Sequence, residues 1–169
     1  MNEAQRPHAD ADELALRRFQ TELMLAFSRV NQQVLRRSAQ LLDDAGIADI
    51  TPARANALIV LFNARRPLNA RELARELAIT EVTVSRFLKK MEEDGWVERA
   101  PDPADGRAML IRTTRHAREL FPRLVRVCNG VLDDVFGGFD ATELRALADY
   151  VGRVQGNLGP DEDAGQAEP

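Results

Sequence analysis

The residues best suited to bind a charged ligand lie on one predicted helix, from Glu81 to Asp94. Apolar side chains recur along it at intervals of three and four residues, which predicts one buried stripe. The stripe consists of Val84, Phe87, Leu88 and Met91. The other sides carry hydroxyl groups and cations, on Thr83, Ser85, Arg86, Lys89 and Lys90. A guanidinium can pair with a guanine edge and an ammonium with a phosphate, so this face fits DNA. Taken alone, such a face is more often a solvated charged surface.

The elements beside this helix must hold it against a ligand, and their order is informative. A shorter helix over 69–77 precedes it, with Asn69 as the N-cap and Glu72 completing a capping box. Gly95 is expected to end the longer helix. Strands are expected over 96–99 and 108–113, joined by a turn over 101–107 that is rich in Pro, Asp and Gly. Helix, turn, helix and hairpin together are the plan of a winged helix.

The run from Leu73 to Thr114 resembles MarR-type transcription regulators. The matching features are Val84-Ser85-Arg86, the segment from Met91 to Arg99, and Asp105-x-Arg107 in the turn. Thr114 matches the threonine that opens the next helix, whereas Thr113 replaces the leucine that usually precedes it. With the flanking helices the resemblance covers about residues 14–156. Its specificity comes from the order and spacing of several motifs rather than from any single one.

This resemblance implies a homodimer that binds double-stranded DNA as a sequence-specific regulator, in particular a repressor of a pseudo-palindromic operator. In the family the wing arginine enters the minor groove, which implies here that Arg107 does so and that Asp105 holds it in place. Arg71 is expected either to touch phosphate or to pair with Glu72 or Glu76 along its helix.

The resemblance also implies a small effector, often aromatic, that binds between the dimer helices and the winged lobe and releases DNA. In this chain the effector cleft would be lined by residues 19–30, by residues 55–62 and by the start of the fifth helix. A different class of function stays open, because a winged helix can also serve protein contact without any specific operator.

The net charge of −4 is located at the ends of the chain. Residues 1–13 carry a net −3 and residues 157–169 a net −4, so residues 14–156 carry a net +3. DNA binding needs a local cationic face rather than a basic protein, so the overall acidity does not exclude it.

The 169 residues, 44% of them hydrophobic, are enough for one domain with a core. There is no apolar run of about 18 residues, so no membrane span is expected. The N-terminus lacks an apolar signal region, and a single cysteine can form no internal disulfide. These features favour a cytoplasmic location.

The expected fold is mainly helical, with six helices and a small β-hairpin wing in one MarR-like domain over residues 12–158. A winged helix-turn-helix over 51–113 lies between dimerisation helices over 12–45 and 114–158. Residues 1–11 and the acidic segment 159–169 are expected to be disordered. Pro122 should kink or restart the fifth helix. The first helix has more apolar surface than a small winged domain can cover, which suggests a partner helix from a second chain.

The sequence contains no residue set suited to catalysis. It lacks a glycine-rich phosphate loop and a G-x-S-x-G elbow, so no enzyme and no cofactor are expected. His8 and His116 lie too far apart for a metal site, and Cys128 falls at an apolar position of its helix and should be buried. The pair Arg65-Arg66 is expected to offset helix-end carbonyls rather than to contact phosphate.

Overall fold

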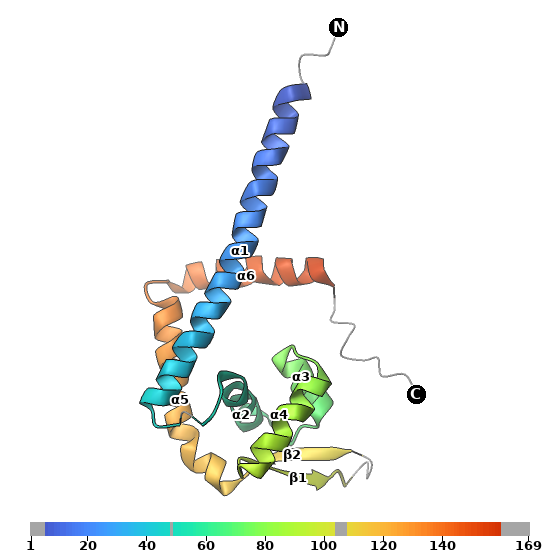
Figure 1. The fold of residues 1–169 in the computed structure, drawn as a ribbon, viewed down its shortest axis with the longest axis vertical. Helices are drawn as coiled ribbons and strands as arrows, with labels where there is room; N and C mark the ends of the chain where they lie inside the picture. The colour runs from blue at the N-terminus through green and yellow to red at the C-terminus, as the bar shows by residue number, and fades with distance from the viewer. Residues whose placement is uncertain (1–5, 48, 104–107, 160–169) are drawn as a thin grey trace.

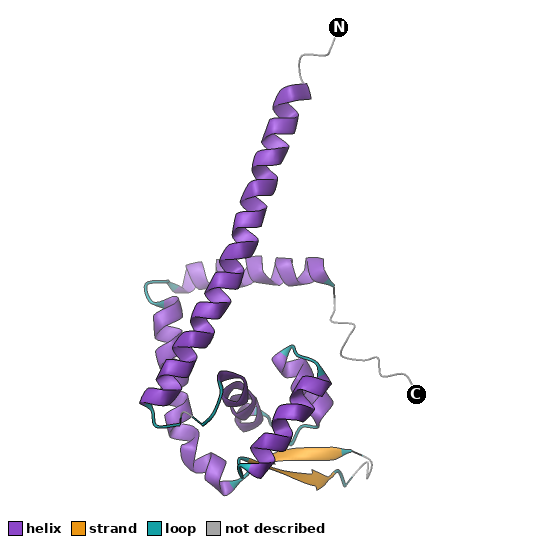
Figure 2. Cartoon of the chain, in the orientation of Figure 1, coloured by secondary structure: helices purple, strands orange, loops and turns teal. Residues whose placement is uncertain are grey.

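The computed structural model describes residues 6–47, 49–103 and 108–159. These residues form six helices and one two-stranded antiparallel sheet (Figures 1 and 2). The helices are α1 (Arg6–Asp44), α2 (Pro52–Asn63), α3 (Ala70–Leu77), α4 (Glu81–Glu93), α5 (Arg115–Phe136) and α6 (Ala141–Leu158). The strands are β1 (Val97–Pro101) and β2 (Met109–Thr113). The predicted class, mainly helical with a hairpin wing, is confirmed.

Side chains close in sequence set the starts of several helices. Asn69 accepts from the backbone N–H of Glu72 at 2.9 Å, and the Glu72 carboxylate accepts from the N–H of Asn69 at 3.0 Å. Asp140 and Glu143 form the same capping box at the start of α6. Thr80 accepts from the N–H of Thr83 and so caps α4. Each cap satisfies N–H groups that have no partner within their helix.

The core lies where α2, α3 and α4 meet the sheet, the first half of α5 and the C-terminal end of α1. Nine of its larger side chains are almost inaccessible to solvent: Leu42, Leu58, Leu73, Leu88, Met91, Ile111, Leu124, Val84 and Val97. The strands pair from Val97 opposite Thr113 to Pro101 opposite Met109. Leu68, just before α3, adds a bridge to Ile111 of β2. This packing fixes α4 against the hairpin, as a winged helix requires.

The first helix begins earlier than predicted, at Arg6 instead of Asp12. Residues 6–11, which were expected to be disordered, are therefore helical in the structure. Pro7 lies in the first turn, where its missing N–H leaves no helix bond unmade, and Ala9 and Ala11 favour the helix. Residues 1–5 and 160–169, the rest of the two predicted disordered segments, lie outside the described residues.

The two end helices differ from the winged region in how little they bury. Figure 1 shows α1 extending far beyond the body, and α6 running across the view at the end of α5 away from the hairpin. Every residue of α6 is exposed. Among the described residues, no helix combines the length and the apolarity needed to cross a bilayer.

The fifth helix is continuous through Pro122, so the proline does not restart it. Figure 1 shows α5 bending between its first and second halves. Proline removes one helix hydrogen bond and its ring crowds the preceding turn, which accounts for a bend. Thr114 caps the start of α5 and also donates to the carbonyl of Gly95 at 2.6 Å. The joint between the hairpin and α5 is therefore held by hydrogen bonds.

Candidate nucleic-acid interface

Helix α4 separates its apolar and polar sides as predicted. Val84, Leu88 and Met91 are each at most 1% exposed. Ser85, Arg86, Lys89 and Lys90 are all exposed on the other side. Thr80 anchors the start of this helix, and Gly95, with a φ of +73°, ends it in a conformation that other residues rarely adopt. The helix thus presents its cations on a rigid, well-anchored support.

Arg86 and Lys89 are the cations of α4 that are free to meet a ligand. Within the described part of the chain, neither side chain has a hydrogen-bond or ion-pair partner. Lys90 differs, because its ammonium pairs with Asp94 one turn later. Asp94 also lies 3.8 Å from Arg54 of α2. Lys90 is therefore tied to an acid at the end of its own helix, since i and i+4 side chains meet on a helix.

Thr83 is less accessible for a DNA contact than the sequence suggested. Its side chain is half-buried, and its hydroxyl lies 2.9 Å from the hydroxyl of Thr80. This contact belongs to the cap of α4 and occupies one hydrogen-bonding position of each hydroxyl. A neighbour has the opposite character: Val82 is 80% exposed in the first turn of α4. Its exposure next to the polar face makes Val82 a further candidate contact.

Arg71 is exposed near the start of α3 and lies 3.8 Å from Glu81 at the start of α4. Within the described residues, Arg71 forms no ion pair with Glu72 or Glu76, the two partners predicted for it. Glu72 instead binds Arg66. Arg71 and Glu81 come from different helices, so their pairing depends on how α3 and α4 pack, which sequence spacing does not encode.

The Arg66–Glu72 pair also revises the expectation for Arg66, which was that it offsets helix-end carbonyls of α2. The guanidinium donates to the Glu72 carboxylate and to the carbonyl of Pro67 at 3.2 Å. The hydrogen bond from Arg66 holds the pKa of Glu72 below its usual value, and the N–H of Asn69 adds to this. The same carboxylate raises the pKa of Arg66. The capping carboxylate of α3 is thus held ionised by the linker that precedes the helix.

The tip of the hairpin, residues 104–107, lies outside the described residues. The predicted pair of Asp105 and Arg107 falls there and remains a prediction. Below the tip, the N–H of Asp102 donates to the carbonyl of Ala108 at 2.9 Å. This bond extends the pairing of the two strands beyond Pro101 and Met109.

The described residues contain no group of three or more potential metal ligands. Cys128 is half-buried, and burial raises the pKa of its thiol, which disfavours the reactive thiolate. Trp96 is buried and stacks on His116 with ring centroids 4.5 Å apart. These residues contribute to packing around the hairpin.

The geometry defines a winged helix-turn-helix protein. Helices α3 and α4 make the helix-turn-helix pair, the β1–β2 hairpin is the wing, and α4 carries an exposed polar and cationic face. Folds of this plan place the second helix of the pair in a DNA major groove.

Comparison with known proteins shows a likeness to one family over the winged region. The MarR family profile matches residues 48–108. The chain is 28% identical over 109 residues to YdgJ of Bacillus subtilis, an uncharacterized HTH-type transcriptional regulator. That alignment covers 64% of this chain and 66% of the relative, just under two thirds of its length. The winged region of the chain, over residues 48–108, thus matches the MarR family, whose members are winged helix-turn-helix transcriptional regulators.

Solved structures share the fold over most of the chain. Sco3205, a MarR family regulator of Streptomyces coelicolor solved in complex with DNA, has a TM-score of 0.74 at 20% identity, covering 84% of this chain and 89% of its own. CouR of Rhodococcus jostii RHA1, solved with p-coumaroyl-CoA, has a TM-score of 0.69 at 22% identity, covering 78% of this chain and 90% of its own. At these identities the likeness establishes the fold alone.

Proposed function

We propose that this protein binds double-stranded DNA as a homodimeric, sequence-specific repressor. The observation that carries the proposal is the exposed side of α4, where Arg86 and Lys89 have no partner among the described residues. A bidentate pair between Arg86 and guanine would specify sequence. Lys89 would contact phosphate and add affinity for any sequence. The DNA complex of the relative Sco3205 supports this use of the fold.

The remaining proposed contacts surround Arg86. Exposed Val82 would touch a thymine methyl group. Ser85 and the half-buried Thr83 would add hydrogen bonds, and Arg107, oriented by Asp105, would enter the minor groove. Arg71 and Lys90 would bind phosphate only after leaving Glu81 and Asp94, their partners in the free protein. Their contribution to affinity is therefore smaller than that of an unpaired cation.

Dimerisation is proposed from the end helices. Large apolar side chains along both helices are exposed to solvent: Leu16, Phe19, Leu23 and Phe27 in α1, and Leu147, Tyr150, Val151 and Val154 in α6. A monomer rarely exposes so much contiguous apolar surface, and two-fold association would cover it. The two copies of α4 would then enter successive major grooves about 34 Å apart, which implies a pseudo-palindromic operator.

Release by a small effector is the last part of the proposal, and the CouR complex with p-coumaroyl-CoA supports it by analogy. Within the proposed cleft, Phe62 of α2 and Phe121 of α5 pack with ring centroids 4.4 Å apart and ring planes tilted by 53°. The apolar hollow of about 520 Å³ between α1 and α6, lined in part by Leu23, Phe27 and Tyr150, belongs to the face that the partner subunit would cover.

A mobility-shift titration against the DNA upstream of the protein's own gene tests the proposal. Arg86→Ala should weaken binding to that DNA by about 1–3 kcal/mol and leave binding to random DNA nearly unchanged. Lys89→Ala should weaken binding to both and lower the salt slope by about 1. Arg123→Ala, which removes an exposed arginine of α5, is the matched control. Equal affinity of the wild type for all sequences would favour a protein-contact module and contradict an operator-binding role.

A further inference from the structure

Glu81 is the acidic residue in the first turn of α4, the helix proposed to read DNA. Helix-turn-helix proteins place the N-terminal residues of their second helix against base edges in the major groove. Glu81 is followed by the exposed Val82 and, five residues after Glu81 itself, by the exposed Arg86. The first two turns of α4 thus carry both a carboxylate and the guanidinium that is proposed to pair with guanine.

The carboxylate of Glu81 is only loosely engaged within the protein. Among residues 6–47, 49–103 and 108–159 it forms one ion pair, with Arg71 of α3. The Nε atom of Arg71 lies 3.8 Å from Oε2 of Glu81, beyond hydrogen-bond distance, and the two side chains are 63% and 52% exposed. A loose, exposed ion pair contributes little to stability. Its oxygens are therefore open to a hydrogen-bond donor from outside the chain.

The backbone that carries Glu81 is held firmly, in contrast to its carboxylate. Ala78 ends α3 with a φ of +51°, a left-handed conformation that residues with a Cβ rarely adopt, and so turns the chain sharply into α4. Thr80 then accepts a hydrogen bond from the N–H of Thr83 at 3.3 Å. The turn before Glu81 and the cap around it fix where the carboxylate enters the interface.

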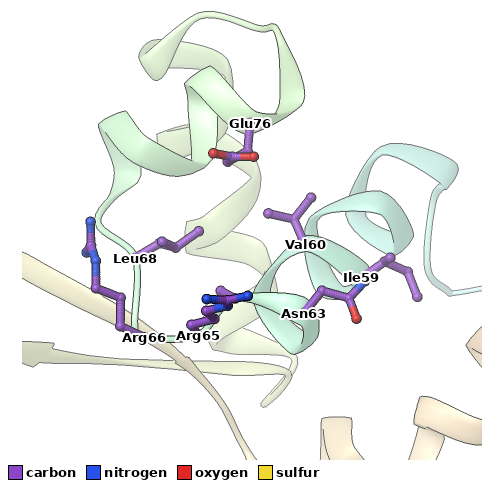
Figure 3. A pocket seen from close by; sticks show the side chains of 8 residues that line it. Ile59, Val60, Asn63, Arg65, Arg66, Leu68 and Glu76 are labelled. Carbon is purple, nitrogen blue, oxygen red and sulfur yellow. The ribbon is translucent and has the colours of Figure 1, made fainter. Parts of the chain in front are cut away.

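The acidic residues of α3 itself are turned away from Arg71. Glu72 binds Arg66 in the preceding segment. Figure 3 shows Glu76 at the hollow between α3 and α2, which Val60 of α2 also lines. Arg71 and Glu76 are five residues apart, so they point about 140° apart around α3. Arg71 therefore meets the first-turn carboxylate of α4 rather than an acid of its own helix.

The other acidic residues of α4 lie at its far end. Glu92 pairs with Arg99 of β1 at 3.2 Å, and Asp94, the C-cap, pairs with Lys90. Glu93 is exposed, and twelve residues of helix place it about 18 Å along the axis from Glu81. Glu81 is thus the acid of α4 that lies at the end expected to meet base edges.

We propose that Glu81 is a specificity-determining residue of the DNA interface and accepts a hydrogen bond from the amino group of a cytosine. This inference rests on the proposed function, because it concerns which operator is read. Cytosine presents its N4 amino group in the major groove, whereas guanine presents the acceptors O6 and N7 and thymine the acceptor O4. A carboxylate has no hydrogen to donate, so opposite those acceptors it would remain unpaired. The unpaired charge selects against the wrong bases.

Arg71 is the positioning residue for Glu81. Its guanidinium approaches the carboxylate from α3 and limits the orientations that the carboxylate can take. It also offsets the negative charge of Glu81, which lowers the cost of bringing that charge toward DNA phosphates. At a sequence without the cytosine, the pair offers DNA neither a hydrogen-bond donor on Glu81 nor a free cation.

Selection of binding sites from a random duplex library, by the wild type and by variants, tests the proposal. Wild-type sites should carry a cytosine at one position of each half-site, with the other bases weakening binding by about tenfold. Glu81→Gln should shift this preference to adenine, because a glutamine amide pairs with N6 and N7 of adenine. Glu81→Ala should accept all four bases at that position. Dissociation constants on duplexes that differ only there measure the change.

Glu93→Gln is the matched control. It removes the same charge from an exposed position of the same helix and should keep the cytosine preference. Arg71→Gln should also keep cytosine as the preferred base but discriminate less strongly, because Glu81 is then held less firmly. Unchanged melting curves for the Glu81 variants would show that the base preference changed in a folded protein.

Two results would overturn the proposal. In the first, both Glu81 variants select the same bases as the wild type, so that the pair with Arg71 only joins two helices. In the second, Glu81→Gln binds every sequence more tightly by the same factor as Glu93→Gln, which is the effect of charge alone. A wild type that selects no sequence would contradict the operator-binding role as well, whereas selected sites that do not depend on Glu81 contradict this inference alone.

Discussion

The winged region and the end helices differ in the exposure of their large apolar side chains. In the winged region leucine and valine are buried, as for Leu58, Leu73 and Val84, each 0% exposed. In α6 every residue is exposed, although Leu147, Val151 and Val154 recur at helical spacing. The winged region can therefore bury its apolar surface within one chain. The end helices cannot, and their apolar stripes need a surface from outside the chain.

This difference suggests where each part of the stability comes from. Burying a large apolar side chain contributes about 1.5–3 kcal/mol, and the winged region gains this within the monomer. For α6 the same gain depends on association, so it varies with protein concentration. The proposed dimer is thus the condition under which α6 contributes to folding at all.

The largest effect is expected in the winged region. Leu88 is 1% exposed in α4, and Leu88→Ala should lower the free energy of unfolding by about 2–5 kcal/mol, because it leaves a cavity in the core. Val82→Ala on the same helix, at a side chain that is 80% exposed, should change it by less than about 0.5 kcal/mol. Urea unfolding of both variants measures the difference. Similar losses for the two would mean that α4 is not anchored as described.

A second, smaller effect should appear in association rather than in the fold of the winged region. Val151→Arg places a charge in the apolar stripe of α6 and should weaken dimerisation by about 2 kcal/mol, roughly thirtyfold. Asp149→Ala, on the opposite side of α6 by helical spacing, is the control. Sedimentation equilibrium gives the dissociation constants, and circular dichroism reports the helices. A dimer of unchanged affinity would show that this stripe is not the interface.

The smallest expected effect is a change in how the free energy of unfolding depends on pH, and it concerns the Arg66–Glu72 pair that links the α2–α3 segment to α3. The pKa of Glu72 is lowered mainly by Arg66, so its ionised form stabilises the native state. That contribution is complete above its unfolded pKa of about 4.3 and disappears as the pH falls through the lower folded value. Glu72→Gln keeps a capping acceptor but cannot titrate. Its stability should therefore fall less than that of the wild type between about pH 6 and pH 3.

Urea unfolding at several pH values measures this slope. Glu76→Gln, an exposed carboxylate on the same helix, is the matched control and should keep the wild-type profile. If Glu72→Gln also keeps the wild-type slope, the pair with Arg66 contributes nothing to folding, and the end of the α2–α3 segment is held by the strand bridge of Leu68 alone.

Much of the fold could be predicted because its signals are local. The boxes at Asn69 and Asp140 and the glycine after α4 act through neighbours only a few residues away, and the structure has all three. The predicted start of α1, Asp12, was wrong because the polar composition of residues 6–11 suggested disorder. Alanine and a proline in the first turn nevertheless permit a helix there. For the candidate site, the exposed positions of Ser85, Arg86 and Lys89 also followed from helical periodicity.

By itself the sequence determined the order of the helices, their caps and the polar face of α4, because these depend on residues within a turn or two of one another. Tertiary structure alone decided which charges meet across elements: Arg71 with Glu81, and Arg54 with Asp94. These residues come from separate elements. Their distances are set by how the apolar sides of those elements pack, and packing is a property of the whole core.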